Sequence, residues 1–154
     1  MAQPSKKSHI ARQALDLFLE YGIKGTSVDM VVRAAEVSKP TVYNHFQDKA
    51  QLLFEVLQLW LAEQAEPQLD ADCLELLMQQ VEQHWLSPQA RRLYALLLGE
   101  GSRAPQAVQL FLQDYDQAWR RCLAAQAQRM QLDPELLQAQ VSHSLLTNLW
   151  LDNQ

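Results

Sequence analysis

The sequence predicts an all-α fold, and three observations support this class. Apolar residues recur every three or four positions in one segment after another, which is the period of an amphipathic helix. Four glycines and six prolines in 154 residues are about half the usual share of these two residues, which disfavours a turn-rich β-sandwich. No segment stands out as a strand candidate. We therefore expect an N-terminal three-helix head, a long fourth helix and a short helical C-terminal domain.

Three helices are predicted for the head. Apolar positions from residue 10 to residue 21 follow the helical period, and Gly22 ends this first helix. Ser27 is placed to cap a second helix of about eight residues. Ser38 is placed to cap a third helix, whose Pro40 lies in the first turn, where a missing backbone N–H costs least.

A longer fourth helix is predicted to join the head to the rest of the chain. Asp48 with Gln51 three residues later resembles a capping box and predicts a helix through about Glu63. The apolar face of this helix consists of Leu52, Val56, Leu59 and Trp60. Beyond Pro67 the same periodicity predicts helices only, in the ranges 74–85, 88–101, 104–130 and 134–149.

Charge and cysteine content narrow the class of protein. The net charge is −5, but residues 1–50 carry +2 and the remaining residues −7, so a mildly basic head precedes an acidic body, unless this difference is a chance fluctuation. Two cysteines 49 positions apart match neither a disulfide framework nor a zinc site. The N-terminus lacks an apolar signal core, and no segment is apolar enough to span a membrane. We expect a cytoplasmic protein with no metal and no membrane partner.

Two short helices separated by a three-residue break predict a helix-turn-helix unit. In the second of them Val42 and Phe46 are four residues apart and must share the buried face. The residues left facing outward all form hydrogen bonds; they are Lys39, Thr41, Tyr43, Asn44 and His45. Hydroxyl groups suit phosphate oxygens, lysine suits guanine or phosphate, and asparagine suits an adenine edge. This pattern predicts a helix that reads DNA.

Lys49 adds an electrostatic observation. It lies in the first turn of the predicted fourth helix, where the helix dipole disfavours a cation. A bound anion would reverse that cost, which predicts a phosphate clamp made by the ammonium group and the backbone amides around Asp48. The alternative is an exposed lysine that tolerates the cost.

Residues 10–57 resemble the DNA-binding domain of tetracycline-repressor-like (TetR family) transcriptional regulators. The resemblance rests on the Ala-Leu-x-Leu-Phe run at 14–18, Gly22, Thr26-Ser27, Ala35-x-Val37-Ser38, Tyr43, Phe46, Lys49 and Leu52. Two departures are Glu36, where many members carry glycine, and Val32, where a small alanine is usual. Glu36 is therefore expected at positive φ, which costs about 1 kcal/mol.

The resemblance implies a homodimer on a palindromic operator, with residues 1–50 as the DNA-binding domain and residues 51–154 as a helical dimerisation and effector-binding domain. It implies base contacts by Lys39, Thr41 and Asn44, and phosphate contacts by Thr26, Ser27, Tyr43, His45 and Lys49, around a helix that Pro40 begins. About 90 residues follow the fourth helix, fewer than is usual in the family. A small or absent ligand pocket is therefore one of the expectations.

The C-terminal part offers candidate sites that have an ordinary alternative. An apolar effector cavity is predicted from Trp60, Met78, Trp85, Tyr94 and Tyr115. Dimer contacts are predicted at Phe111, Trp119 and Leu145. Each of these residues could instead belong to the core of one chain.

The sequence favours a regulator over an enzyme. It has no HExxH, GxSxG, P-loop or CxxC motif, so we predict no catalytic residue and no cofactor. The predicted function is a sequence-specific DNA-binding transcriptional regulator, a homodimeric repressor that a small apolar effector releases. The alternatives are a helical adaptor whose head binds protein, and a regulator without a small-molecule pocket.

Overall fold

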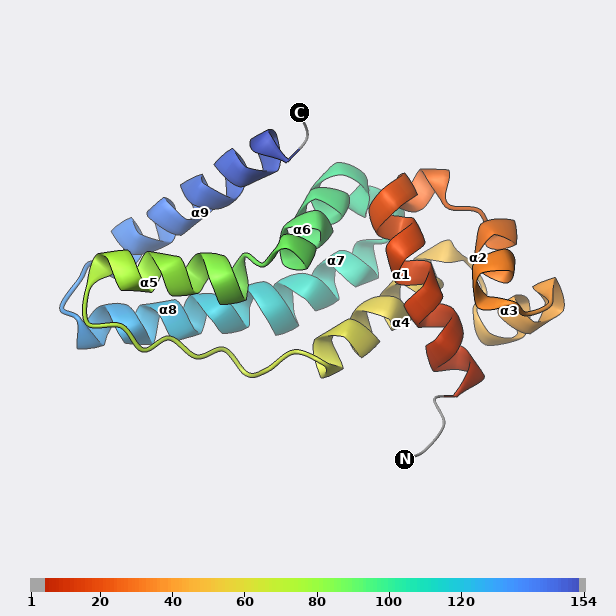
Figure 1. Cartoon of the computed structure of the whole chain (residues 1–154), viewed down its shortest axis with the longest axis horizontal. Helices are drawn as coiled ribbons and strands as arrows, with labels where there is room; N and C mark the ends of the chain where they lie inside the picture. Colours follow the sequence, from red (N-terminus) through yellow and green to blue (C-terminus); the bar gives the residue numbers. More distant parts are fainter. Residues whose placement is uncertain (1–4, 153–154) are drawn as a thin grey trace. The chain divides into compact units, whose positions relative to one another are not determined.

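The computed structural model describes residues 5–152, and every regular element in that range is a helix, which confirms the predicted all-α class (Figure 1). The outermost residues of the two predicted domains, 1–4 and 153–154, lie outside it. The α-helices are α1 Lys6–Gly25, α2 Val28–Ala35, α3 Lys39–His45, α4 Lys49–Ala62, α5 Leu74–Gln80, α6 Pro88–Glu100, α7 Pro105–Phe111, α8 Gln117–Arg129 and α9 Pro134–Leu151. Three short helices of other types complete the order: η1 Val81–Trp85, η2 Gly101–Arg103 and η3 Leu112–Asp116.

The chain divides into two compact units. One runs from the start of the described residues to Gln64 and also takes in 96–112, and the other comprises 65–95 and the chain from Gln113 onward. In the first unit α1 packs against α2 and α4, and α4 also packs against α7. The predicted functional boundary between residues 50 and 51 falls in the first turn of α4, so it does not coincide with the edges of these units.

Local capping explains where the head helices begin. The Ser27 hydroxyl oxygen accepts from the Met30 amide at 3.2 Å and opens α2. The Ser38 hydroxyl oxygen accepts from the Thr41 amide at 3.3 Å and opens α3. Each of these contacts lies within four residues of chain, which is why the sequence alone predicted the starts of these helices.

Two backbone positions shape the head. Gly22 has φ 75° and interrupts α1, which continues as a short last turn to Gly25. Glu36 has φ 53° and ψ 43° and ends α2 in the left-handed region, as expected from its place in the turn before α3. The three-residue turn between α2 and α3 is therefore the predicted one, with glutamate in the position that glycine usually occupies.

The start of α4 differs in one detail from the predicted capping box. The Asp48 carboxylate accepts from the Gln51 amide at 2.8 Å, as expected. The Gln51 side chain, however, accepts from the amide of Gln47 and not from that of Asp48. On the inner face of α4, Leu52, Val56 and Trp60 are buried and Leu59 is half-buried.

Two predicted helices of the C-terminal part contain π-helical turns. Predicted helix 74–85 is α5 followed by the π-helical η1, and predicted helix 104–130 is α7, the π-helical η3 and α8. A π turn inserts one extra residue per turn and shifts the faces of the helix that follows. Within η3 the neighbours Tyr115 and Asp116 are both buried. Among the described residues no helix is long and apolar enough to cross a membrane.

Candidate nucleic-acid interface

A groove of about 460 Å³ lies in the head and collects polar side chains from three helices. It brings together the first turn of α2, two residues of α3 and the start of α4. Its lining consists of Ser27, Val28, Asp29, Lys39, Tyr43, Gln47, Asp48 and Lys49. The amino-terminal ends of α2 and α4 carry backbone N–H groups without intrahelical acceptors, and those that Ser27 and Asp48 do not cap are suited to an anionic partner. The lining holds two lysines and two aspartates, so its side chains alone do not select for an anion.

The polar face of α3 is presented as predicted. Val42 and Phe46 are each only 2% exposed and fix the helix to the head. Tyr43 is 50% exposed, and Lys39, Pro40 and Asn44 are exposed as well. An aromatic side chain held half in solvent beside polar neighbours is available for contact with a partner.

The remaining polar residues of α3 are held more closely by their surroundings. The Thr41 and Ser38 hydroxyl oxygens lie 2.7 Å apart and share a hydrogen bond. His45 is half-buried, with its ring centroid 6.1 Å from that of Phe46. Thr41 and His45 thus lie beside the exposed face of α3, but their side chains are less accessible than those of Tyr43 and Asn44.

Lys39 has a partner that the sequence did not indicate. Its ammonium lies 3.1 Å from the Asp29 carboxylate of α2, and both side chains are more than half exposed. The hydrogen bond to Asp29 raises the pKa of Lys39, so the ammonium stays charged. Any phosphate or base contact by Lys39 must therefore replace this ion pair. An exposed ion pair contributes little to stability, so its replacement costs little.

The structure corrects the prediction of a phosphate contact by Thr26. This side chain is 1% exposed, and its hydroxyl donates to the carbonyl oxygens of Leu17 at 3.1 Å and Gly22 at 2.7 Å. Thr26 thus closes the end of α1, whereas the adjacent Ser27 is exposed and lines the groove. The sequence pattern pairs the two residues but does not show which one faces inward.

The structure also corrects the predicted role of the Lys49 ammonium. This group donates to the carbonyl oxygens of Ile23 at 2.8 Å and Thr26 at 2.9 Å, at the end of α1. The carboxyl-terminal end of a helix is its negative end, so these carbonyl oxygens, and not the predicted phosphate, balance the charge of the Lys49 ammonium. The backbone amides in the first turn of α4 remain suited to an anion in the groove.

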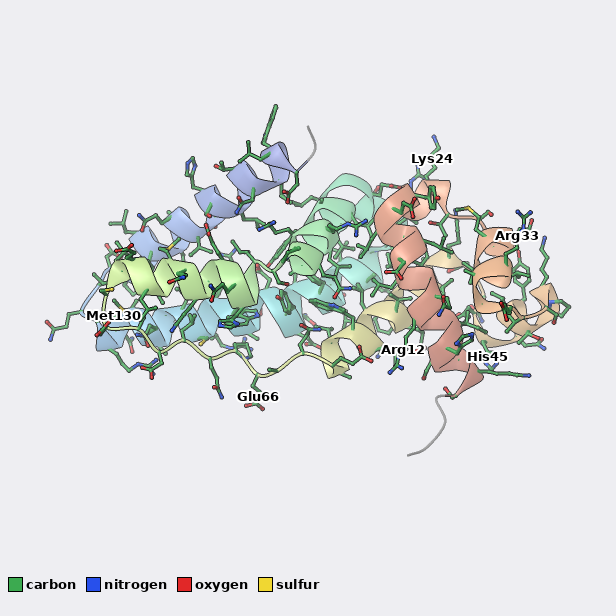
Figure 2. The ribbon with its side chains drawn as sticks, viewed as in Figure 1. Arg12, Lys24, Arg33, His45, Glu66 and Met130 are labelled. Atoms are coloured by element: carbon green, nitrogen blue, oxygen red, sulfur yellow. The ribbon has the colours of Figure 1, made fainter. Side chains whose placement is uncertain are left out.

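Two further basic side chains of the head lie outside the groove lining and face solvent. Lys24 extends from the end of α1 and Arg33 from α2 (Figure 2), and both are exposed. They add positive potential to the same end of an otherwise acidic chain.

Most of the predicted ligand residues form a hydrogen-bonded aromatic cluster in the second unit. The Trp85 indole N–H donates to the Tyr94 hydroxyl at 3.0 Å, and that hydroxyl donates to Asp116 at 2.7 Å. The Tyr115 hydroxyl donates to the Trp85 carbonyl oxygen at 2.6 Å. Burial raises the pKa of both tyrosines, so they stay protonated. These polar groups are hydrogen-bonded within the cluster, which favours the alternative that these residues belong to the core of one chain.

The other two predicted ligand residues lie elsewhere. Trp60 belongs to the first unit, where its ring stacks on Phe111 with centroids 6.0 Å apart. Met78 is half-buried on α5.

The three predicted dimer residues are buried within one chain, which corrects that prediction. Phe111 stacks on Trp60, and Trp119 stacks on Trp85 with the ring planes 5° apart. Leu145 lies on the buried face of α9. Helical periodicity identified these residues as apolar and inward-facing but could not say whether a second chain or the same chain covers them.

A different apolar face of α9 is exposed. Its apolar members are Leu136, Ala139, Leu146 and Trp150, and His143 lies between them at the same helical spacing. Trp150 is 75% exposed. The opposite face, with Leu137, Val141, Leu145 and Leu149, is buried. The sequence carries the signal for this second face as a second set of apolar positions at helical spacing in the same segment.

Residues 10–56 match the family model described as bacterial regulatory proteins, tetR family. The HTH-type transcriptional repressor DhaR of Mycobacterium sp. (strain GP1) is 38% identical over 58 residues, which are 38% of this chain and 29% of that protein. The HTH-type transcriptional regulator AcrR of Shigella flexneri is 38% identical over 53 residues, which are 34% of this chain and 25% of that protein. The matched segments thus span less than a third of the length of these two relatives.

Solved structures share the fold over nearly the whole chain. MexZ, a key repressor responsible for antibiotic resistance in Pseudomonas aeruginosa, aligns with a TM-score of 0.64 at 20% identity, covering 96% of this chain and 84% of that chain. At this identity the likeness shows the fold alone. The head is a helix-turn-helix domain. The match of residues 10–56 to the tetR family model confirms the resemblance seen in the sequence.

Proposed function

We propose that this chain is a sequence-specific DNA-binding transcriptional regulator that works in the cytoplasm as a homodimeric repressor on a palindromic operator. The observation that carries the proposal is the exposed polar face of α3, held on buried Val42 and Phe46 and bordered by the groove at the ends of α2 and α4. In this proposal α3 lies in the major groove, where Lys39, Thr41 and Asn44 meet base edges.

The phosphate contacts come from the margin of the same face. Ser27 and Tyr43 line the groove, His45 follows on α3, and the amides in the first turn of α4 close its far side. Pro40 sets the first turn of α3 without removing a needed donor. The net charge of −5 does not oppose this proposal, because the excess of acid lies outside the first 50 residues.

The test begins with selection of bound fragments from genomic DNA, which supplies the operator. On that operator Lys39→Ala is expected to weaken binding and to lower the slope of log affinity against log salt by about 1 if Lys39 touches phosphate, or to relax sequence preference if it touches a base. The matched control is Arg12→Ala, which removes the same charge from α1 outside the groove, where Arg12 pairs with Glu63.

Tyr43→Phe tests the phosphate margin separately. It removes only a hydroxyl, so the fold is expected to remain while affinity falls severalfold. Wild-type affinity for both Lys39→Ala and Tyr43→Phe would refute the DNA-reading role of α3. Binding that does not weaken as salt rises would favour the protein-adaptor alternative instead.

We propose that the second chain of the dimer covers the exposed face of α9. Exposed leucines and a tryptophan in one continuous stripe form the kind of surface that a self-complementary interface uses. Leu146→Glu is expected to give a monomer in sedimentation at micromolar concentration. Leu98→Glu, which alters an exposed leucine on α6, is the matched control and should leave the assembly unchanged.

Release by a small apolar effector remains part of the proposal through the family resemblance. The regulator without such a pocket is a second candidate, and one observation favours it: Trp85, Tyr94 and Tyr115 already satisfy one another's polar groups. Operator binding measured with and without a metabolite extract separates the two, since only the first predicts release.

A further inference from the structure

The connection between the regular part of α1, which ends at the kink, and α2 is held by side chains from distant parts of the chain. It comprises residues 22–26 and begins at Gly22, whose φ of 75° and ψ of 176° interrupt the hydrogen-bond ladder of α1. It ends at the buried Thr26 and leads directly into Ser27, the cap of α2 that lines the groove. The conformation of this connection therefore sets where the groove-lining end of α2 lies.

Lys49 holds the carbonyl groups of this connection. Its ammonium donates to Ile23 and Thr26, with the Lys24 carbonyl oxygen at 3.5 Å. This contact comes from the start of α4, which is part of the same groove.

Glu100 holds the connection through an amide. Its carboxylate accepts from the backbone N–H of Lys24 at 2.8 Å, across 76 positions of sequence. The same carboxylate fills the space beside Gly22, where a Cβ atom would overlap Oε1. Arg103 lies 3.6 Å from the carboxylate and helps to orient it. The Glu100 side chain is 29% exposed, so it is packed against the connection more closely than a solvated surface acid.

We propose that Glu100 is a positioning residue for DNA binding: its carboxylate fixes residues 22–26 and thereby places Ser27 and the first turn of α2 against the DNA backbone. The proposal rests on the proposed DNA-binding function and adds to it a residue outside the helix-turn-helix. Glu100 lies outside the matched residues 10–56 in the sequence but contacts Lys24 in the structure. The role therefore depends on the fold that brings Glu100 to the head.

A positioning role differs from a general structural role in what it changes. The Lys24–Glu100 hydrogen bond is open to solvent, so its loss affects the unfolding equilibrium little. Its loss does free the Lys24 amide and widens the range of positions open to Ser27. No phosphate contact is removed, so affinity should fall without a change in its salt dependence.

The experiment compares three versions of the full chain with the wild type: Glu100→Ala, Glu100→Gln and Glu63→Ala. Glutamine keeps an acceptor oxygen in the same place. Glu63→Ala removes an equal charge from an exposed carboxylate that pairs with Arg12 at the end of α4. Hydrogen exchange at the Lys24 amide is measured by NMR in the free protein, and operator affinity is measured across a salt series.

Glu100→Ala is expected to accelerate exchange at Lys24 about tenfold and to weaken operator binding about tenfold with an unchanged salt slope. Glu100→Gln should restore most of both, and Glu63→Ala should match the wild type. The proposal is overturned if Glu100→Ala leaves Lys24 exchange unchanged, or if its operator affinity equals that of Glu63→Ala. A wild-type chain that binds no DNA refutes the proposed function itself, and this role with it, whereas loss of the difference between the variants refutes the role alone.

Discussion

Tyr94→Phe tests whether the aromatic cluster of the second unit is a structural core. The Tyr94 hydroxyl accepts from the Trp85 indole N–H and donates to the Asp116 carboxylate, and all three residues are buried. Removal of the hydroxyl leaves a buried donor and a buried carboxylate oxygen without this partner. A buried neutral donor left without an acceptor lowers the free energy of unfolding by about 1–3 kcal/mol, and loss of a hydrogen bond to a charged group lowers it by about 1.5–3 kcal/mol.

The expected loss of stability is therefore about 3–5 kcal/mol, a large part of the total stability of a domain of this size. Urea unfolding followed by tryptophan fluorescence measures it, at fixed protein concentration because dimerisation would shift the midpoint. Tyr21→Phe removes a hydroxyl from a half-exposed residue and should stay within about 0.5 kcal/mol of the wild type. If Tyr94→Phe is as stable as Tyr21→Phe, the hydrogen-bonded cluster does not exist in solution.

Three further predictions concern stability and reactivity. Burial raises the pKa of Tyr94 and Tyr115 above 10.0, so these tyrosines ionise at lower pH in the unfolded chain than in the folded one. Their contribution to the free energy of unfolding should be complete below about pH 10 and fall above it by about 1.4 kcal/mol per pH unit for each tyrosine. Urea unfolding at a series of alkaline pH values measures this loss. Gly22→Ala should destabilise by about 1–3 kcal/mol, because its φ and ψ lie in a region nearly restricted to glycine and because the added Cβ would displace the Glu100 carboxylate. Gly99→Ala, in α6 with open space around it, should stabilise by up to about 1 kcal/mol in the same unfolding assay. Thiol labelling followed by mass spectrometry should modify the exposed Cys73 before Cys122, whose partial burial raises the pKa of its thiol; equal rates would contradict that placement.

Interactions within a few residues of chain explain what could be predicted in the head. Ser27, Ser38 and Asp48 each accept from a backbone amide three positions ahead, so the starts of α2, α3 and α4 follow from local sequence. Helical periodicity placed Val42 and Phe46 on one buried face for the same reason. The other residues of α3 then face outward, and they form its polar face.

Side chains with distant partners could not be assigned in this way. Nothing near Lys49 in the sequence shows that carbonyls 23–26 positions earlier accept its protons, and nothing near Glu100 points to the amide of Lys24. The inward turn of Thr26 likewise depends on the kink at Gly22.

The sequence by itself determined the helices, their caps and the polar face of α3, because helical hydrogen bonds and caps join residues that are near neighbours in the chain. Only the tertiary structure decided which apolar residues are covered by the same chain and which face of α9 stays open. Both of these faces carry leucines, and only the packing of α9 against its neighbours, α8 among them, determines which of the two is buried.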